Sequence, residues 1–268
     1  MQKIIAIANQ KGGVGKTTTC VNLASYLALM GKKVLAVDID PQGNCSSGFG
    51  IDKSKVKYST YSVLSGEVDV KTAVQPTCVK NLDILPSNID LAGAEVELVG
   101  VEDREKVLKK VLAPVRNVYD YILIDCPPSL GMLNINTLTA ADSIIVPTGA
   151  DYLSVKGLDL IIQSVVKARS GINPGLQIEG ILYTMVNGRT NNEKDIIAAV
   201  EKTLGERVRI FHTQIPHSVR AKEAVQNGKS IYSFSKSSKV AKAYEELTKE
   251  VNHNAQRTRH RSRSDGVR

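Results

Sequence analysis

Short apolar runs alternate with longer amphipathic stretches along most of the chain. The repeated order of a strand followed by a helix predicts an α/β fold, with a mostly parallel, twisted sheet and helices on both faces. The expected strands are Ile4–Ala8, Val34–Ile39, Leu82–Leu85, Tyr121–Ile124, Ser143–Pro147, Gln177–Val186 and Arg209–Thr213, and the expected helices are Lys16–Met30, Asp103–Arg116, Gly131–Ala141, Val155–Ser170, Glu193–Leu204 and Ser237–Val251.

Two segments depart from this alternation. Gly43–Val79 has little periodicity, and we interpret it as a short helical excursion on the same domain. Residues 252–268 are polar and contain five arginines against one aspartate, which predicts a disordered basic tail. The pattern therefore predicts a single domain over residues 1–251.

Composition narrows the class of protein. Of the 268 residues, 42% are hydrophobic, Trp is absent and Phe occurs three times, so the core must consist of Val, Ile, Leu and Ala. Such a core is typical of parallel strands covered on both faces. The net charge of +8 favours partners with negative charge, above all nucleic acid.

The four cysteines, Cys20, Cys45, Cys78 and Cys126, form no Cys-x-x-Cys pair. We therefore expect neither a disulfide framework nor a zinc site, and free thiols are typical of a reducing cytoplasm. The first residues form no secretory segment, and no apolar run approaches the length of a membrane span. The expected location is cytoplasmic.

A glycine-rich stretch follows the first apolar run and precedes the first expected helix. Backbone N–H groups of such a loop, with the helix N-terminus, cradle phosphates, which predicts a P-loop NTPase-like fold. Lys16 would reach the outer phosphates and Thr17 would face Mg2+. The first glycine of the usual pattern is replaced by Gln10, and the loop holds a second lysine. The predicted nucleotide-binding residues are Lys11, Gly12, Gly13, Val14, Gly15, Lys16, Thr17 and Thr18.

Acidic residues end two further strands. Asp38 and Asp40 close the second apolar run before Pro41, and Asp125 closes the run at Tyr121–Ile124. In parallel sheets the carboxyl ends of the strands form the ligand-binding edge. We therefore predict Asp125, together with Thr17, as the Mg2+ site, with Asp125 acting through a water because Mg2+ retains several waters.

These elements together resemble the ParA/Soj family of partition ATPases, a group with a deviant Walker A loop that is related to MinD. The resemblance covers about residues 3–251. It is carried by Lys11-Gly-Gly-Val-Gly-Lys-Thr-Thr18, Asp38-Ile-Asp-Pro-Gln-Gly-Asn44, Asp125-Cys-Pro-Pro-Ser129, Leu91-Ala-Gly-Ala-Glu-Val-Glu97 and Ile215-Pro-His-Ser-Val-Arg220.

The resemblance implies ATP and Mg2+ as cofactors and a homodimer that encloses ATP. In that homodimer, Lys11 is expected to reach the phosphates bound by the partner subunit, and Gly12 is expected to lie at the dimer contact. Asp40 matches the acid that orders the attacking water, so Lys11, Lys16 and Asp40 form the expected catalytic set. Such a site acts by positioning and charge neutralisation.

Base and DNA contacts are also implied by the resemblance. Pro216 and Ser218 match the segment that contacts adenine, although the family's Ile-Pro-Arg-Asn is here Ile-Pro-His-Ser. Arg189 and Arg220 match DNA-contacting positions, and Lys222 extends that basic face. Contacts of this kind neutralise phosphates of double-stranded DNA without reading its sequence.

The expected function is an ATPase switch that segregates a chromosome or plasmid. Its turnover is slow and is stimulated by a ParB-like protein, and it associates with the nucleoid. One alternative is a MinD-like membrane ATPase that positions division, which requires an amphipathic apolar helix that the residues after Val251 do not provide. A second is a regulator that binds ATP without hydrolysis, which retention of Asp40 and Asp125 disfavours.

Overall fold

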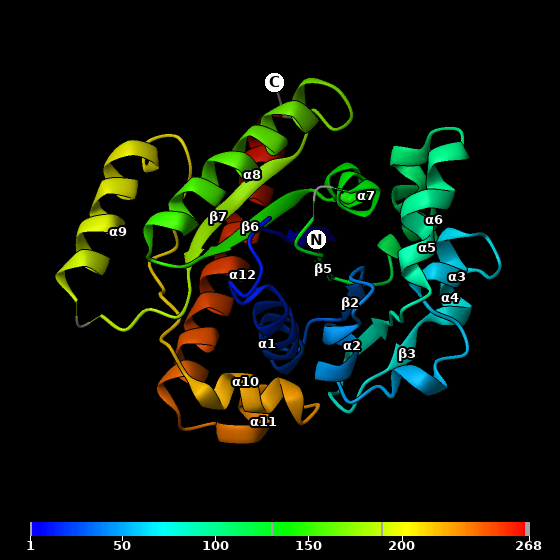
Figure 1. Cartoon of the computed structure of the whole chain (residues 1–268), viewed down its shortest axis with the longest axis horizontal. Coiled ribbons are helices and arrows are strands. Elements are labelled where there is room, and N and C mark those ends of the chain that lie inside the picture. Colours follow the sequence, from blue (N-terminus) through cyan, green and yellow to red (C-terminus); the bar gives the residue numbers. More distant parts are fainter. Residues whose placement is uncertain (1, 130, 189, 266–268) are drawn as a thin grey trace.

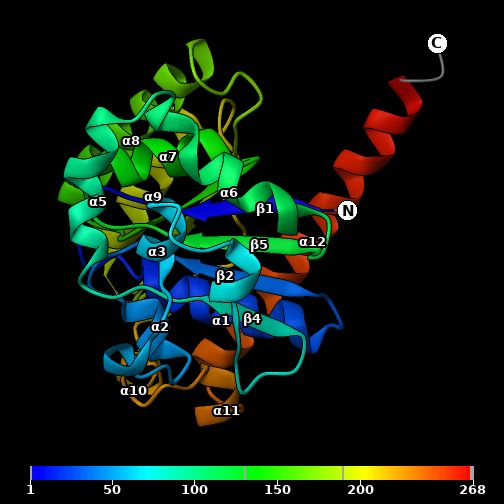
Figure 2. The same ribbon diagram turned by 90° about the vertical axis from the view of Figure 1, so that its right-hand side faces the viewer.

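The computed structural model describes residues 2–129, 131–188 and 190–265. Its centre is a seven-stranded sheet in the order β3-β4-β2-β5-β1-β6-β7. All neighbouring strands run parallel except β3 and β4, which are antiparallel. Helices cover both faces (Figures 1 and 2), so the predicted fold class is confirmed.

The elements follow the predicted alternation for most of the chain. The strands are β1 (Lys3–Ile7), β2 (Val34–Asp38), β3 (Gln75–Pro76), β4 (Leu82–Leu85), β5 (Tyr121–Asp125), β6 (Ser143–Thr148) and β7 (Gln177–Tyr183). The α-helices are α1 (Lys16–Leu29), α2 (Asn44–Gly48), α3 (Thr60–Leu64), α4 (Val70–Ala73), α5 (Leu91–Glu97), α6 (Val107–Arg116), α7 (Met132–Ala140), α8 (Tyr152–Ser170), α9 (Asn191–Leu204), α10 (Val219–Gln226), α11 (Ile231–Ser235) and α12 (Lys239–Asp265). Short 3-10 helices occupy Lys53–Lys55, Leu98–Gly100 and Arg104–Lys106.

Successive residues of each strand enter two separate cores, because side chains alternate between the faces of a sheet. In β1, Ile4 packs beneath the layer that contains α6, α7 and α8, whereas Ile5 packs against α1 and α12. Figure 2 shows the sheet between α6, α7 and α8 above and α1, α10 and α11 below. Both faces of β1 are therefore buried, as its unbroken apolar sequence predicts.

The predicted strand Arg209–Thr213 is wrong. Only an isolated bridge forms there, between Ile181 and Ile210. The reason is a carboxylate on α12: Glu250 accepts the backbone N–H groups of His212 at 3.1 Å and Thr213 at 2.8 Å. These donors are therefore not available to a neighbouring strand.

The boundaries of other segments also differ from expectation. Gly43–Val79 contains three short α-helices, the 3-10 helix Lys53–Lys55 and the edge strand β3. The helix expected from Asp103 begins as an α-helix only at Val107, after a 3-10 turn. The domain end predicted at Val251 falls inside α12, which continues to Asp265.

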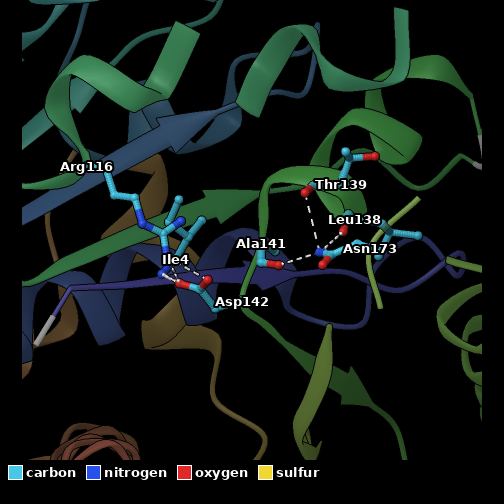
Figure 3. Close-up of polar contacts among 7 residues, drawn as sticks. All are labelled: Ile4, Arg116, Leu138, Thr139, Ala141, Asp142 and Asn173. Atoms are coloured by element: carbon cyan, nitrogen blue, oxygen red, sulfur yellow. Dashed lines mark hydrogen bonds and ion pairs between the residues drawn. The ribbon is translucent and has the colours of Figure 1, made fainter. Parts of the chain in front are cut away.

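One ion pair fixes the start of β1 beneath α6. Asp142 accepts the backbone N–H of Ile4 at 2.8 Å and two hydrogen bonds from Arg116, at 2.7 and 2.9 Å (Figure 3). The connection from α7 to β6 and the end of α6 are thus joined to the strand that leads into the phosphate loop.

No helix in the described ranges is both long and apolar enough to cross a bilayer.

Candidate nucleotide and metal site

The glycine-rich loop joins β1 to α1 at the carboxyl edge of the sheet. Gly13 and Gly15 have φ values of 75° and 81°, a left-handed conformation that glycine adopts without strain. Lys16 is the first residue of α1, with only 7% of its surface exposed, and its Nζ donates to the carbonyl of Lys11 at 3.2 Å. The loop curls back over its own lysine, as a phosphate cradle requires.

Opposing effects act on the pKa of Lys16, and burial is the larger. Burial lowers the pKa of the Lys16 ammonium, and the nearby Asp125, Cys126 and Asp40 act in the opposite direction. A phosphate in the cradle would add negative charge and favour the protonated form.

Three contacts that the sequence analysis missed hold the loop. Thr184, just after β7, donates from Oγ1 to the carbonyl of Val14 at 2.9 Å. Asn9 donates to the carbonyl of Pro147 at 2.7 Å and accepts the N–H of Lys11 at 3.0 Å. Because the carboxyl ends of parallel strands share one edge, the polar Thr184 near the end of the Gln177–Val186 run was the available signal for the first of these contacts.

Thr17 and Asp125 meet as the metal prediction requires. Thr17 Oγ1 donates to Asp125 Oδ2 at 2.7 Å. Asp125 is fully buried, and its Oδ1 has no hydrogen-bond partner within the described structure. Burial, and then the charge of Asp38, raise the pKa of Asp125 well above its usual range.

These groups fit Mg2+. A buried carboxylate oxygen without a partner is costly unless a cation or donor satisfies it. Among the described residues, no group of three or more His, Cys, Asp or Glu side chains is arranged to hold a metal. Mg2+ does not need such a cage, because it combines one or two protein ligands with waters and substrate phosphates.

The acids after β2 lie beside Asp125. Asp38 stands opposite Asp125 in the strand register and is fully buried. It accepts the N–H and the hydroxyl of Ser46, both at 2.7 Å. Burial raises the pKa of Asp38 to about 6, although these hydrogen bonds oppose the rise.

Asp40 lies next along the same edge. It is 8% exposed, and its carboxylate accepts the N–H of Gln42 at 2.9 Å. Its carbonyl accepts the Ser87 hydroxyl at 2.8 Å. Asp40 is therefore held by the two turns that follow β2 and β4, close enough to Lys16 for their charges to interact.

The second lysine of the loop differs from the first. Lys11 Nζ pairs with Asp151 at 3.0 and 3.2 Å, and 34% of the lysine side chain is exposed. Gly12 is exposed, and a Cβ added there would meet nothing within 4 Å in its own chain. Among the described residues of one chain, steric crowding therefore does not explain a glycine at this position.

The predicted base-contacting segment reaches the same edge. Val186 and Pro216 form an isolated parallel bridge, and the N–H of Ile215 bonds to the carbonyl of Tyr183 at 2.9 Å. Pro216 and Ser218 are both partly buried. This brings the segment next to Thr184, the residue that holds the phosphate loop.

Two of the three predicted DNA residues lie on α10. Arg220 and Lys222 are exposed, and Arg220 donates to the hydroxyl of Ser235 at 3.0 Å. Arg189, the third predicted DNA contact, lies outside the described residues.

The side-chain amide of Asn22 links the neighbouring helix α11 to the helix that follows the phosphate loop. Asn22 on α1 is fully buried, donates to the carbonyl of Thr18 at 2.7 Å and accepts the N–H of Ile231, the first residue of α11, at 2.7 Å.

The sheet order, the glycine-rich loop and the Thr17–Asp125 contact define a P-loop ATPase. The AAA domain family matches residues 2–178. The chain is 49% identical over 251 residues to the sporulation initiation inhibitor protein Soj of Bacillus subtilis, covering 94% of this chain and 98% of Soj. It is 45% identical over 251 residues to the chromosome-partitioning ATPase Soj of Treponema pallidum, covering 94% and 97%. The chain belongs to the ParA/Soj family of partition ATPases.

A solved structure extends the comparison. The cobyrinic acid a,c-diamide synthase of Mycobacterium smegmatis, with bound ADP and magnesium, superposes with a TM-score of 0.80 at 35% identity, covering 93% of each chain. A related fold thus holds an adenine nucleotide and magnesium. The predicted family is confirmed, whereas the roles of individual residues remain predictions.

Proposed function

We propose that this protein is an ATP-dependent molecular switch that segregates a chromosome or plasmid. ATP and Mg2+ occupy the cradle formed by Lys11–Thr18, with Thr17 and Asp125 as the metal site and Asp125 acting through a water. Lys16 neutralises the outer phosphates, and Asp40 orders the attacking water. The bound Mg2+ supplies charge neutralisation at the phosphates.

The observation that carries the proposal is the contrast between the two lysines. Lys16 is buried inside its own loop, whereas Lys11 is partly exposed and pairs with the exposed Asp151. Such an ion pair is weak, so Lys11 can leave it at little cost. In the proposed homodimer it enters the partner's phosphate site beside Gly12, which leaves room for a second chain.

The proposed partners are non-specific double-stranded DNA, bound through Arg220, Lys222 and the predicted Arg189, and a ParB-like protein that stimulates slow turnover. Positive side chains on an exposed helix contact phosphates and release counterions, so this binding would weaken steeply with salt. The proposed location is the cytoplasm, where the protein associates with the nucleoid and not with a membrane. We also propose that residues 1–251 form a single domain.

Binding to a DNA fragment of random sequence tests the proposal in ATP, in ADP and without nucleotide. Retention should require ATP, fall in Arg220→Glu and Lys222→Glu, and vanish in Lys16→Ala. Lys109→Glu on α6 is the control, because Lys109 is exposed and lies on a different helix from Arg220 and Lys222. DNA binding that is equal in ATP, in ADP and without nucleotide would refute the DNA-binding switch. DNA binding that is unchanged by both charge reversals at low salt would refute it as well.

The same binding assay, with anionic vesicles in place of DNA, tests the alternative of a MinD-like membrane ATPase. ATP-dependent vesicle binding without DNA binding would favour a membrane ATPase instead.

A further inference from the structure

A carboxylate on α5 caps the helix that follows the metal ligand. Glu95 accepts the backbone N–H of Met132 at 2.6 Å and that of Leu133 at 3.4 Å. The residue at the N-cap of α7 is Gly131, which has no side chain to offer. Glu95 therefore supplies from another helix the acceptor that an N-cap side chain normally provides.

The same contact explains the glycine. Gly131 has φ −73° and ψ −173°, a backbone conformation open to any residue. A Cβ at this position would nevertheless collide with the carboxylate of Glu95. Glycine is thus needed here for the approach of Glu95 and not for its own backbone.

The first turn of α7 is joined in turn to the segment after Asp125. Asn134 is 6% exposed, and its Nδ2 donates to the carbonyl of Pro127 at 3.1 Å and also to that of Ser129. The position of this turn therefore sets the path of the chain that leaves the metal ligand.

The rest of α7 is fixed independently. Asn136 accepts the N–H of Leu108 on α6 at 3.0 Å. At the other end, Asn173 donates to the carbonyls of Leu138 and Ala141, both at 2.8 Å (Figure 3). Loss of Glu95 would hence release the first turn, with Asn134, and leave the remainder of the helix in place.

We propose that Glu95 is a positioning residue for ATP hydrolysis. It caps α7 and thereby fixes the path of the Pro127–Ser129 segment, which follows Asp125 in the chain and helps to keep that carboxylate in place. The inference rests on the proposed ATPase cycle. In this role Glu95 acts through its hydrogen bonds to the first turn of α7.

The test compares Glu95→Ala and Glu95→Gln with Glu97→Ala. Glu97 is the matched control, because it lies on the same helix and bonds to Tyr61 at 3.0 Å instead of α7. Affinity for a fluorescent ATP analogue should stay within about twofold in all variants, since the phosphate loop is intact. Turnover should fall about tenfold in Glu95→Ala, the scale of a lost helix cap, and less in Glu95→Gln, which keeps one acceptor oxygen.

Gly131→Ala provides an independent arm. Alone it should impair turnover, because its Cβ displaces the Glu95 carboxylate, whereas in the Glu95→Ala background it should cause no further loss. Additive effects of the two substitutions would contradict the proposal, as would equal turnover in Glu95→Ala and Glu97→Ala.

Hydrogen exchange separates this inference from the proposed function. A non-hydrolysable ATP analogue with Mg2+ should protect amides of residues 126–135 in the wild type and in Glu97→Ala, and much less in Glu95→Ala. Absence of protection in the wild type, or full protection in Glu95→Ala, overturns the role of Glu95. A wild type that shows this protection but hydrolyses no ATP refutes the ATPase cycle instead.

Discussion

Removal of the Asp151 charge that pairs with Lys11 should strengthen ATP-dependent dimerisation. Asp151→Asn keeps the shape of the side chain and removes its charge. Because 34% of the Lys11 side chain and 53% of the Asp151 side chain are exposed, the pair belongs to the weak class, worth about 0.2–1 kcal/mol. Formation of a symmetric dimer breaks two such pairs in the wild type and none in Asp151→Asn. The free energy of dimerisation should therefore be more favourable in the variant by about 0.4–2 kcal/mol, which is about a 2- to 30-fold lower dissociation constant.

Sedimentation equilibrium with a non-hydrolysable ATP analogue measures this constant. Asp159→Asn on α8 is the control, since Asp159 is exposed, forms no ion pair in the described structure and changes the net charge equally. Lys11→Ala should prevent the dimer. A dimer of Asp151→Asn that is no tighter than that of Asp159→Asn would show that the Lys11–Asp151 pair does not restrain the lysine.

Three further outcomes follow from the site. Asp40→Ala should bind ATP and dimerise but release phosphate at least about tenfold more slowly in a turnover assay; wild-type turnover would remove Asp40 from catalysis. Thr184→Val leaves the carbonyl of Val14 without its donor, so the protein should lose about 1 kcal/mol, seen as a melting temperature about 2–4 °C lower and weaker ATP binding. An unchanged melting curve would count against that anchor. Because burial raises the pKa of Asp125, protons compete with Mg2+ at low pH, so Mg2+ with ATP should raise the melting temperature more at pH 7.5 than at pH 5.5; an equal shift at both would argue against Asp125 as the ligand.

The parts of the site that the sequence predicts are those in which chemistry and local backbone coincide. The glycines of the loop, Lys16 and Thr17 follow one another between a strand and a helix, so their spacing alone brings them together. Asp125 was predictable because a parallel sheet collects strand ends at one edge.

The rest depends on contacts between distant segments. Thr184 holds Val14 across 170 positions of sequence, and its hydroxyl looks like that of any threonine after a strand. The prediction of a strand at Arg209–Thr213 was wrong for the same reason. Glu250, on a helix distant in sequence, accepts backbone N–H groups that a strand would have donated to its neighbour. Periodicity reports the burial of a segment but not the identity of its hydrogen-bond partner.

The strand order also sets when the phosphate loop can form during synthesis. β1 pairs with β5, whose residues are 121–125, and with β6, from residue 143 onward. At about 5–20 residues per second, the apolar β1 waits on the order of ten seconds for its neighbours to leave the ribosome. The most local motif in the chain therefore acquires its working shape only after about half of the chain has been synthesised, and substitutions that weaken β5 or β6 should reduce the yield of folded protein before they affect any step of ATP hydrolysis.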